Sequence, residues 1–541
     1  MSNTYWERIA APWHGFNRRD LFRRGGLLMA AQALGGSVKQ AIAAPLDLGP
    51  EMYRSIGVRP LINAKGTYTI ITGSTTLPEV KAAMDRASRS FVDMDELMDG
   101  VGARLAELTG AEWGIVTDGC CAALTHCTAA AIAGGNPERM QKLPDLAGLK
   151  SEVIIPDYSR NVYDHAIRML GVKLIVVKDP AELERAFNER TAMVYILGGP
   201  GDDGPLGTRA VSAVARKHGV PVIVDAAAEV LTIKPNVHLE RGANAVAYSG
   251  GKCLRGPQAA GLLLGDKNWL QGAWINSAPH HAFGRSLKCG KEEIMGMLEA
   301  VELWVKRDHK AEWAQWESWL HTIADSATRV PGVEAKFDQG PDGLSNRSPG
   351  LTLSWDGEKV GITGSELGKI LREGEPRIVL ADATGTRPGR MASSVSFVPY
   401  QMSPGEDKIV AERIHAVLAK PPHFDAPRVP QGTPANVAGQ WDVHLEFNYG
   451  STDHTLILEQ DGAKLAGTHR GEFASGDLHG SVAANTVEFE SSLPTEGVRV
   501  SFRFRGWFKD GQMSGDATLG EYGKAKWTAR RHSYANTPAE G

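Results

Sequence analysis

The strongest constraint on the fold is a regular alternation of short apolar segments with helix-like segments between about residues 53 and 267. Seven segments read as strands, at 113–117, 153–156, 173–177, 193–197, 220–224, 245–248 and 260–264. Most are apolar along their whole length, which is typical of strands covered on both faces. Helix-like segments lie between them, for example at 164–170, 180–189 and 208–218. This alternation predicts an α/β domain over 45–290 with a mostly parallel sheet.

Three further regions follow this domain. The pattern from 291 to about 328 predicts a long connecting helix, and a small α+β domain then extends to residue 420. Five prolines between 421 and 436 mark a linker that cannot continue a helix. Alternating segments at 441–447, 455–460, 486–490, 499–504 and 524–530 then predict an all-β barrel or sandwich over 437–532. This last domain is similar to the lipocalin-like barrels appended to exported bacterial enzymes, and we expect an accessory or oligomer-contact role for it.

The N-terminal segment 1–44 resembles a twin-arginine export signal. The motif NRRDLFR at 17–23 precedes a mildly apolar stretch that ends in an A-x-A pattern at 41–43. Gln32, Lys39 and Gln40 interrupt the stretch, so no membrane span is predicted. The segment predicts export of the folded protein to the periplasm. An amphipathic N-terminal helix in a cytoplasmic protein is the alternative.

Composition excludes several classes of function. The 541 residues carry a formal net charge of −4 and no long basic stripe, so no nucleic-acid partner is expected. The five cysteines match neither zinc spacing nor a disulfide framework, and we expect them to be small buried residues. His280 and His281 are adjacent in a loop, but no metal site is predicted there.

The segment SGGKCLRGPQ at 249–258 joins two of the apolar segments and places Lys252 between glycines. A lysine on a tight turn just past a strand end is fixed in position and partly shielded from water, as a Schiff-base lysine must be. The Ser249 hydroxyl, three residues earlier, is placed to donate to a cofactor phosphate. Most lysines are solvated surface groups, so the segment does not decide the chemistry alone.

A carboxylate and a helix start supply the other two elements. Asp225 directly follows the segment 220–224. This position is the carboxyl end of the predicted strand, where ligands bind in parallel α/β sheets. Alone it reads as a helix N-cap, but together with Lys252 it suits the carboxylate that pyridoxal phosphate (PLP) enzymes place at the pyridine nitrogen. Gly119 follows the segment 113–117 and begins a helix of small residues, whose free N–H groups can hold a phosphate.

With these elements, residues 53 to 418 resemble the selenocysteine synthase-like branch of the fold-type I PLP-dependent enzymes, which includes D-glucosaminate-6-phosphate ammonia-lyase. The resemblance lies in 59–67, 108–112, 118–124, 249–258, 288–294 and Asp225. It implies a three-layer α/β sandwich with PLP as cofactor. It also implies that Gly119, Cys120 and Cys121 form the phosphate cup and that Lys252 forms the internal aldimine.

Further contacts are expected from residues near these segments. Three candidates for the group that stacks on the cofactor ring follow the segment 153–156, namely Tyr158, Tyr163 and His165. Candidates for binding the substrate are cationic, because bidentate arginine suits a carboxylate, and they are Arg160, Arg255, Arg285, Lys288 and Arg377.

The resemblance implies a PLP-dependent lyase that removes ammonia by α,β-elimination from a hydroxylated 2-amino acid or amino-sugar acid. Aldolase, racemase or aminotransferase chemistry is the nearest alternative, because a fold alone does not choose the reaction. An exported binding protein without catalysis is a further alternative. Fold-type I enzymes usually build each site from two subunits, so a homodimer or larger homo-oligomer is expected.

Overall fold

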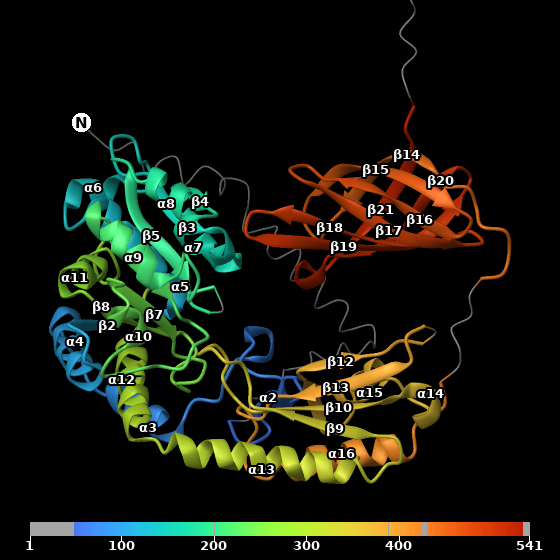
Figure 1. Ribbon diagram of the computed structural model, residues 1–541, viewed down its shortest axis with the longest axis horizontal. Helices are drawn as coiled ribbons and strands as arrows, with labels where there is room; N and C mark the ends of the chain where they lie inside the picture. The colour runs from blue at the N-terminus through green and yellow to red at the C-terminus, as the bar shows by residue number, and fades with distance from the viewer. Residues whose placement is uncertain (1–47, 200, 388, 425–429, 534–541) are drawn as a thin grey trace, which may run out of the picture. The chain divides into compact units, whose positions relative to one another are not determined.

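The computed structural model describes residues 48–199, 201–387, 389–424 and 430–533 (Figure 1). The predicted export signal at 1–44 and part of the predicted linker lie outside these residues. The described residues divide into two units, with the boundary between Leu61 and Ile62. Among the described residues, no helix has both the length and the apolar character needed to cross a membrane.

A seven-stranded sheet organises the α/β domain, with the strand order β2-β8-β7-β6-β5-β3-β4. Its strands are β2 (Trp113–Asp118), β3 (Glu152–Pro156), β4 (Lys173–Val177), β5 (Thr191–Leu197), β6 (Val222–Asp225), β7 (Ala245–Ser249) and β8 (Ala260–Gly265). The pairs β4–β3, β3–β5, β5–β6 and β6–β7 are parallel, and only β8 pairs antiparallel with both of its neighbours. The seven predicted strands and the mostly parallel sheet are therefore confirmed.

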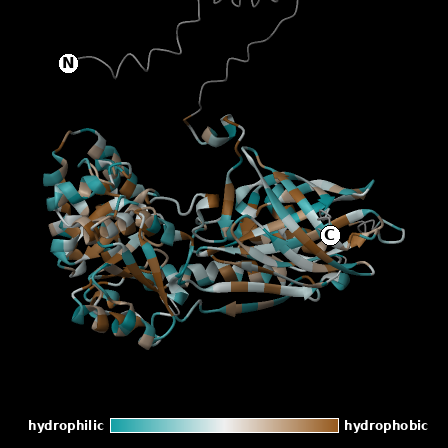
Figure 2. Cartoon of the chain, turned by 90° about the horizontal axis from the view of Figure 1, so that it is seen from above, coloured by the Kyte–Doolittle hydropathy of each residue, from teal (hydrophilic) through white to brown (hydrophobic). Residues whose placement is uncertain are grey.

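The strands of this sheet are apolar because they are buried on both faces. β3 and β8 are buried at every position, and β5 at all but its last residue. Figure 2 shows long apolar runs in these strands, whereas polar and apolar residues alternate in the C-terminal domain. Burial at successive positions removes the period of two, as parallel α/β sheets require.

Helices surround this sheet, some packed on its strands and others on neighbouring helices (Figure 1). They are α3 (Pro78–Ser88), α4 (Met94–Thr109), α5 (Gly119–Ala133), α6 (Pro137–Lys142), α7 (His165–Arg168), α8 (Pro180–Ala186), α9 (Thr208–Lys217), α10 (Val237–Glu240) and α11 (Lys267–Ile275). α5 is buried along almost its whole length and contacts β2, β5, β6, β7 and β8. Its alanines and cysteines leave room for that close packing, since small side chains let a helix approach a sheet.

The predicted long connecting helix is two helices. α12 (Lys291–Lys306) ends at Arg307, whose backbone is extended, and α13 (His309–Ala327) begins directly afterwards. The Asp308 carboxylate accepts hydrogen bonds from the backbone N–H groups of Lys310 and Ala311. Aspartate is a strong N-cap, so the break lies where the sequence offers one.

A four-stranded antiparallel sheet of order β12-β13-β10-β9 forms the small α+β domain. Its strands are β9 (Glu334–Asp338), β10 (Gly350–Asp356), β12 (Asp382–Thr384) and β13 (Ala392–Phe397), with β1 (Leu61–Ala64) and β11 (Arg377–Leu380) outside the sheet. The accompanying helices are α14 (Gly357–Val360), α15 (Gly364–Glu373) and α16 (Glu406–Ala419). Their core is separate from that of the large sheet.

The C-terminal domain is a closed barrel of eight antiparallel strands in sequential order. The strands are β14 (Gly439–Glu446), β15 (Ser451–Asp461), β16 (Lys464–Arg470), β17 (Ser475–Ala483), β18 (Thr486–Thr495), β19 (Val498–Lys509), β20 (Gln512–Thr518) and β21 (Lys524–Arg531). The interior residues of β14 and β21 alternate with exposed ones. The predicted all-β barrel is confirmed, and its up-and-down order is that of lipocalin-like barrels.

Candidate active site

Lys252 lies on a tight turn directly after β7. The backbone N–H of Gly250 donates to the Ala260 carbonyl at 2.8 Å, and the N–H of Gly256 donates to the Gly250 carbonyl at 2.8 Å. A Cβ at position 250 would lie 2.7 Å from the Ala260 oxygen, so the turn requires glycine there. The turn half-buries Lys252, and its amine has no hydrogen-bond or ion-pair partner among the described residues. A lysine held in this way is free to react with a carbonyl group.

Asp225 is the last residue of β6 and is only 2% exposed. One carboxylate oxygen, Oδ2, accepts a hydrogen bond from the Tyr195 hydroxyl at 3.0 Å. The other, Oδ1, accepts from the Ala227 backbone N–H at 3.1 Å and from the Cys120 thiol at 3.4 Å. Three donors compensate the burial of this charged group, so it is not a lone helix cap.

The N-terminus of α5 supplies backbone N–H groups. Gly119 begins the helix with a φ of 75°, and no side chain caps the first turn. The N–H groups of a first turn have no partner within the helix, and the helix dipole favours an anion there. Cys120 is buried and Cys121 is exposed. This helix start is therefore suited to hold a phosphate.

These three elements lie at one edge of the sheet. β6 and β7 are parallel, and β2 runs in the same direction because both β2 and β7 pair antiparallel with β8. The register pairs Asp225 with Ala247, Ser249 with Gly261, and Asp118 with Ala260.

The charges of Asp225 and Lys252 both reach the first turn of α5, where the Cys120 thiol lies 3.4 Å from Asp225 Oδ1. Burial raises the pKa of Cys120, the charge of Asp225 raises it further, and the charge of Lys252 lowers it. Burial likewise raises the pKa of Cys121, with the same two charges acting in the same opposed directions. Asp225 and Lys252 therefore both act on the first turn of α5. Ser249, half-buried at the end of β7, has no hydrogen-bond partner for its hydroxyl among the described residues.

The three ring-stacking candidates differ in where they lie. Tyr158 donates its hydroxyl to the Leu206 carbonyl at 3.1 Å. Tyr163 lies within reach of the site's charges, since burial raises the pKa of Tyr163 and the charges of Cys121 and Asp225 add to the rise. His165 is exposed as the first residue of α7. Their role at the cofactor ring stays a prediction.

The five cationic candidates also stay predictions as substrate ligands. Arg160 forms an ion pair with the buried Asp164 at 2.7 Å. The Arg255 guanidinium donates hydrogen bonds to the Thr75 carbonyl at 3.1 Å and to the Thr75 hydroxyl at 3.0 Å. Arg377 donates to the Arg372 carbonyl at 3.1 Å. Arg285 and Lys288 are exposed.

The predictions for the histidine pair and the cysteines have mixed outcomes. His280 contacts Asp95 at 3.2 Å, and the described residues contain no group of three or more metal-ligating side chains. Cys120, Cys127 and Cys289 are buried as expected, whereas Cys253 is half-buried and Cys121 exposed.

A cavity of about 730 Å³ borders the Lys252 turn. The turn contributes Lys252, Cys253 and Arg255 to its wall. Aromatic and cationic side chains from elsewhere complete much of the lining, including Trp304, Arg307, Trp313, Trp316 and Tyr400. Asp225, Ser249 and residues 119–121 do not line it. The cavity therefore adjoins the strand-end site and does not contain the phosphate cup.

Tyr195 and Asn161 are site residues that the sequence did not reveal. Tyr195 lies within the continuous apolar strand β5, and its hydroxyl contacts Asp225. The Asn161 amide donates to the same hydroxyl at 2.9 Å. A buried tyrosine hydroxyl usually needs a polar partner, which was the available signal, but the sequence does not name that partner.

Known proteins share sequence and fold with this chain. No family model matches the sequence. The chain is 28% identical over 381 residues to D-glucosaminate-6-phosphate ammonia lyase of Salmonella typhimurium, covering 68% of this chain and 98% of that protein. It is also 28% identical over 386 residues to 5'-C-glycyluridine monooxygenase-decarboxylase of a Streptomyces species, covering 68% and 92%.

A solved structure of D-glucosaminate-6-phosphate ammonia-lyase matches with a TM-score of 0.60 and 27% identity, covering 69% of this chain and 99% of that one. The chain has the fold-type I fold of PLP-dependent enzymes. L-seryl-tRNA(Sec) selenium transferase of Proteus mirabilis is 23% identical over 281 residues, covering 47% and 58%. The predicted resemblance to the selenocysteine synthase-like branch of fold-type I proteins is confirmed.

The residues of this fold-type I core fit PLP. The cofactor has an aldehyde, a basic ring nitrogen and a phosphate, and the site offers an amine without a partner, a buried carboxylate and an uncapped helix start. Gly261 keeps the cup open, because a Cβ there would lie 2.4 Å from the Gly119 carbonyl carbon and 2.7 Å from the Thr117 hydroxyl. β8 can therefore pass directly beneath the start of α5.

We expect Gly261→Ala to weaken PLP binding by roughly tenfold or more, because the added methyl group displaces the first turn of α5 at a cost of about 1–3 kcal/mol. Equilibrium dialysis of PLP against wild type and variant measures the change. Gly272→Ala in α11 is the control, since a Cβ there meets only Ala130 at 3.5 Å. Equal PLP affinities for the two variants would contradict a close approach of β8 to the cup.

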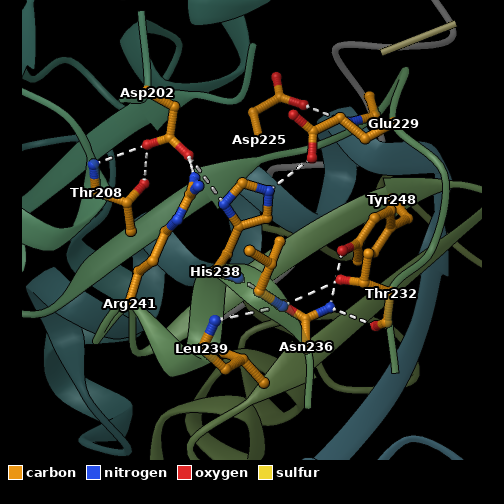
Figure 3. A network of polar contacts seen from close by, with 12 residues as sticks. Asp202, Thr208, Asp225, Glu229, Thr232, Asn236, His238, Leu239, Arg241 and Tyr248 are labelled. Atoms are coloured by element: carbon orange, nitrogen blue, oxygen red, sulfur yellow. Dashed lines mark hydrogen bonds and ion pairs between the residues drawn. The ribbon is translucent and has the colours of Figure 1, made fainter. Parts of the chain in front are cut away.

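A buried ion-pair network anchors the loop after Asp225 (Figure 3). His238 is 1% exposed and lies between two carboxylates, with Nε2 at 2.6 Å from Glu229 and Nδ1 at 3.3 Å from Asp202. The Nδ1 contact has an ion-pair distance without hydrogen-bond geometry. Arg241 also pairs with Asp202. Glu229 lies four positions after Asp225, so the network holds the loop that follows β6.

This network predicts a pH-dependent stability. Burial alone lowers the pKa of His238, but the neighbouring carboxylates of Asp202 and Glu229 prevail and raise it to about 9. A raised pKa contributes stability that is complete below pH 6.5 and is lost as the pH rises through 9. We expect a loss of about 3 kcal/mol across that range. Urea unfolding of wild type and of His238→Gln at both pH values measures how much of the change in the free energy of unfolding depends on His238. An identical pH dependence of the two proteins would contradict this role of His238.

Proposed function

We propose that this chain is a PLP-dependent lyase that releases ammonia from a hydroxylated 2-amino acid or amino-sugar acid. The observation that carries the proposal is that the Asp225 carboxylate contacts Cys120 at the uncapped start of α5, at 3.4 Å, while Lys252 lies on the turn after the neighbouring parallel strand β7. Support for the reaction class comes from the Salmonella ammonia lyase, 98% of whose length is matched. The matched solved structure belongs to an enzyme of the same name.

Each element has a distinct task in this proposal. Lys252 binds the cofactor aldehyde, the first turn of α5 with Ser249 holds the phosphate, and Asp225 keeps the ring nitrogen protonated. PLP, when bound, stabilises the negative charge that develops at the substrate α-carbon. The Lys252 amine would also serve as the general base that accepts the substrate α-proton. The β-hydroxyl then leaves with a proton as water, and hydrolysis of the released enamine gives a 2-keto acid and ammonia.

The two sequence relatives are named for different reactions, so the reaction itself is what needs to be tested. The Streptomyces relative is named as a monooxygenase-decarboxylase and is as similar in identity as the ammonia lyase. The same fold therefore carries different reactions, and the site rather than the fold must decide. We favour the lyase because the matched structure at a TM-score of 0.60 is an ammonia-lyase.

Product analysis tests the proposal. The full chain, reconstituted with PLP, is incubated with D-glucosaminate 6-phosphate and, separately, with β-hydroxy amino acids under anaerobic conditions. We expect equal amounts of ammonia and 2-keto acid without an added keto acid. A requirement for oxygen would favour monooxygenase chemistry, a requirement for a keto acid would favour transamination, and PLP binding without any product would favour a non-catalytic binding protein.

We also propose that the protein is exported in folded form and works as a homo-oligomer. The NRRDLFR motif at 17–23 supports export, and the resemblance to fold-type I enzymes supports assembly. Cell fractionation of wild type and a variant with Arg18→Lys and Arg19→Lys tests export, which we expect to fail in the variant. Analytical ultracentrifugation tests assembly, and a monomer would contradict it.

A further inference from the structure

We propose that Tyr195, oriented by Asn161, is a positioning residue that keeps the Asp225 carboxylate charged and correctly turned toward the cofactor's ring nitrogen. This inference rests on the proposed function, in which Asp225 is the partner of that nitrogen. Tyr195 acts only through Asp225.

Two hydrogen bonds connect Asn161, Tyr195 and Asp225, and both are donated in the direction of Asp225. Tyr195 is completely buried on β5, which is parallel to β6, and its hydroxyl lies 3.0 Å from Asp225 Oδ2. The Asn161 amide nitrogen lies 2.9 Å from the same hydroxyl. A carboxylate only accepts hydrogen bonds, so the single hydroxyl proton of Tyr195 points to Asp225 and its oxygen accepts from Asn161.

The orientation of the Asn161 amide is fixed by its other contacts. Its oxygen accepts from the Tyr163 backbone N–H at 2.7 Å, and its nitrogen donates to the Ser159 carbonyl at 2.7 Å. A flipped amide would place two donors together at Tyr163 and two acceptors together at Ser159. The NH₂ group of Asn161 is therefore the end that faces Tyr195. The backbone contacts of Asn161 thus fix the direction of the hydrogen bonds from Asn161 to Tyr195 and from Tyr195 to Asp225.

Tyr195 is suited to remain a donor. Burial raises the pKa of Tyr195 well above its usual value, and the neighbouring charge of Asp225 raises it further, so the hydroxyl keeps its proton. The terminal torsion of an aspartate is broad, so a carboxylate held on one side only can rotate. Ala227 and Cys120 hold Oδ1, whereas Tyr195 is the donor to Oδ2 among the described residues. Losing this bond releases one side of the carboxylate.

The titratable groups that face Asp225 come from several elements. Cys120 and Cys121 lie on α5, Tyr163 precedes α7 and Tyr195 lies on β5, while Lys252, after β7, acts on the same two thiols. The thiol and phenol groups are neutral near pH 7, because burial raises the pKa of Cys120, Cys121 and Tyr163. A difference between wild type and a variant in how PLP binding changes on mild acidification can therefore be assigned mainly to the Asp225 carboxylate and its contact with the cofactor.

The test measures PLP affinity by equilibrium dialysis over a pH series. Tyr195→Phe keeps the ring and removes the hydroxyl, and we expect roughly ten- to hundredfold weaker PLP binding at neutral pH. Its affinity should also fall at a higher pH during acidification than that of wild type, because a carboxylate with one donor fewer is protonated more readily. The pH profile distinguishes positioning from packing.

Two further variants make the test selective. Asn161→Asp keeps the oxygen for the Tyr163 N–H but offers the Tyr195 proton a second acceptor, so it should shift the profile in the same direction. Tyr248→Phe is the matched control: Tyr248 is 1% exposed on β7, on the other side of β6 from Tyr195, and its hydroxyl accepts from Asn236 at 2.8 Å. We expect its PLP affinity and pH profile to match those of wild type.

The outcomes separate this inference from the proposed function. If wild type does not bind PLP, the proposed function fails. If wild type binds PLP and Tyr195→Phe behaves as Tyr248→Phe does, the proposed function stands and the inference is overturned. Equal losses in both tyrosine variants, with an unshifted pH profile, would also overturn it, because the hydroxyls would then matter only for packing.

Discussion

Replacing Lys252 with alanine is expected to abolish covalent attachment of PLP and to lower the rate of ammonia release by roughly 10²–10⁴-fold or more. The same amine holds the cofactor and removes the substrate α-proton in the proposed reaction, so one substitution removes both. The visible absorbance of the reconstituted protein and a coupled ammonia assay measure the two effects.

Lys217→Ala is the control for this substitution. Lys217 lies on α9, pairs with Glu184 at 3.2 Å and is 66% exposed. Its removal should leave absorbance and rate unchanged. A Lys252→Ala protein that retains the visible band and most of the rate would contradict the role of Lys252.

Replacing Asp225 with asparagine is expected to lower the rate by up to about a hundredfold while Lys252 still binds the cofactor. The amide has almost the shape of the carboxylate but no charge, so the ring nitrogen is no longer held protonated. A hydrogen bond between charged groups contributes up to about 3 kcal/mol, which corresponds to about a hundredfold in rate. The visible absorbance and the ammonia assay, measured together, separate binding from catalysis.

Asp157→Asn is the matched control, because Asp157 directly follows the parallel strand β3 and is exposed. It should behave as wild type does. A rate for Asp225→Asn within a few-fold of wild type would contradict the assignment of Asp225 to the ring nitrogen.

The α/β sheet could be predicted because its strands are apolar at nearly every position and alternate with helices. The barrel was predicted less completely. Glycines and small polar residues weaken the alternation in β16, β17 and β20, so only the neighbouring strands stood out in the sequence. Closure into eight strands depends on pairing between the first and last strands, β14 and β21, which local pattern does not show.

The position of Lys252 and Asp225 at strand ends could be predicted, because each comes after a continuous apolar segment. Lys252 lies between glycines after β7, and Asp225 ends β6. The residues that hold Asp225 could not be predicted in the same way. Tyr195 and Asn161 lie 34 positions apart and meet only through the parallel arrangement of the sheet. Contacts between side chains of different elements are a property of the fold, so sequence pattern alone does not reveal them.

The most direct test of the account is to reconstitute the full chain with PLP, reduce it with borohydride and locate the label by peptide mass spectrometry. Reduction fixes a cofactor that is bound to an amine, so the labelled residue is the one that holds it. We predict a single phosphopyridoxyl group on Lys252. A label on another lysine, or no label after PLP binding, would contradict the placement of the cofactor at the ends of β6 and β7.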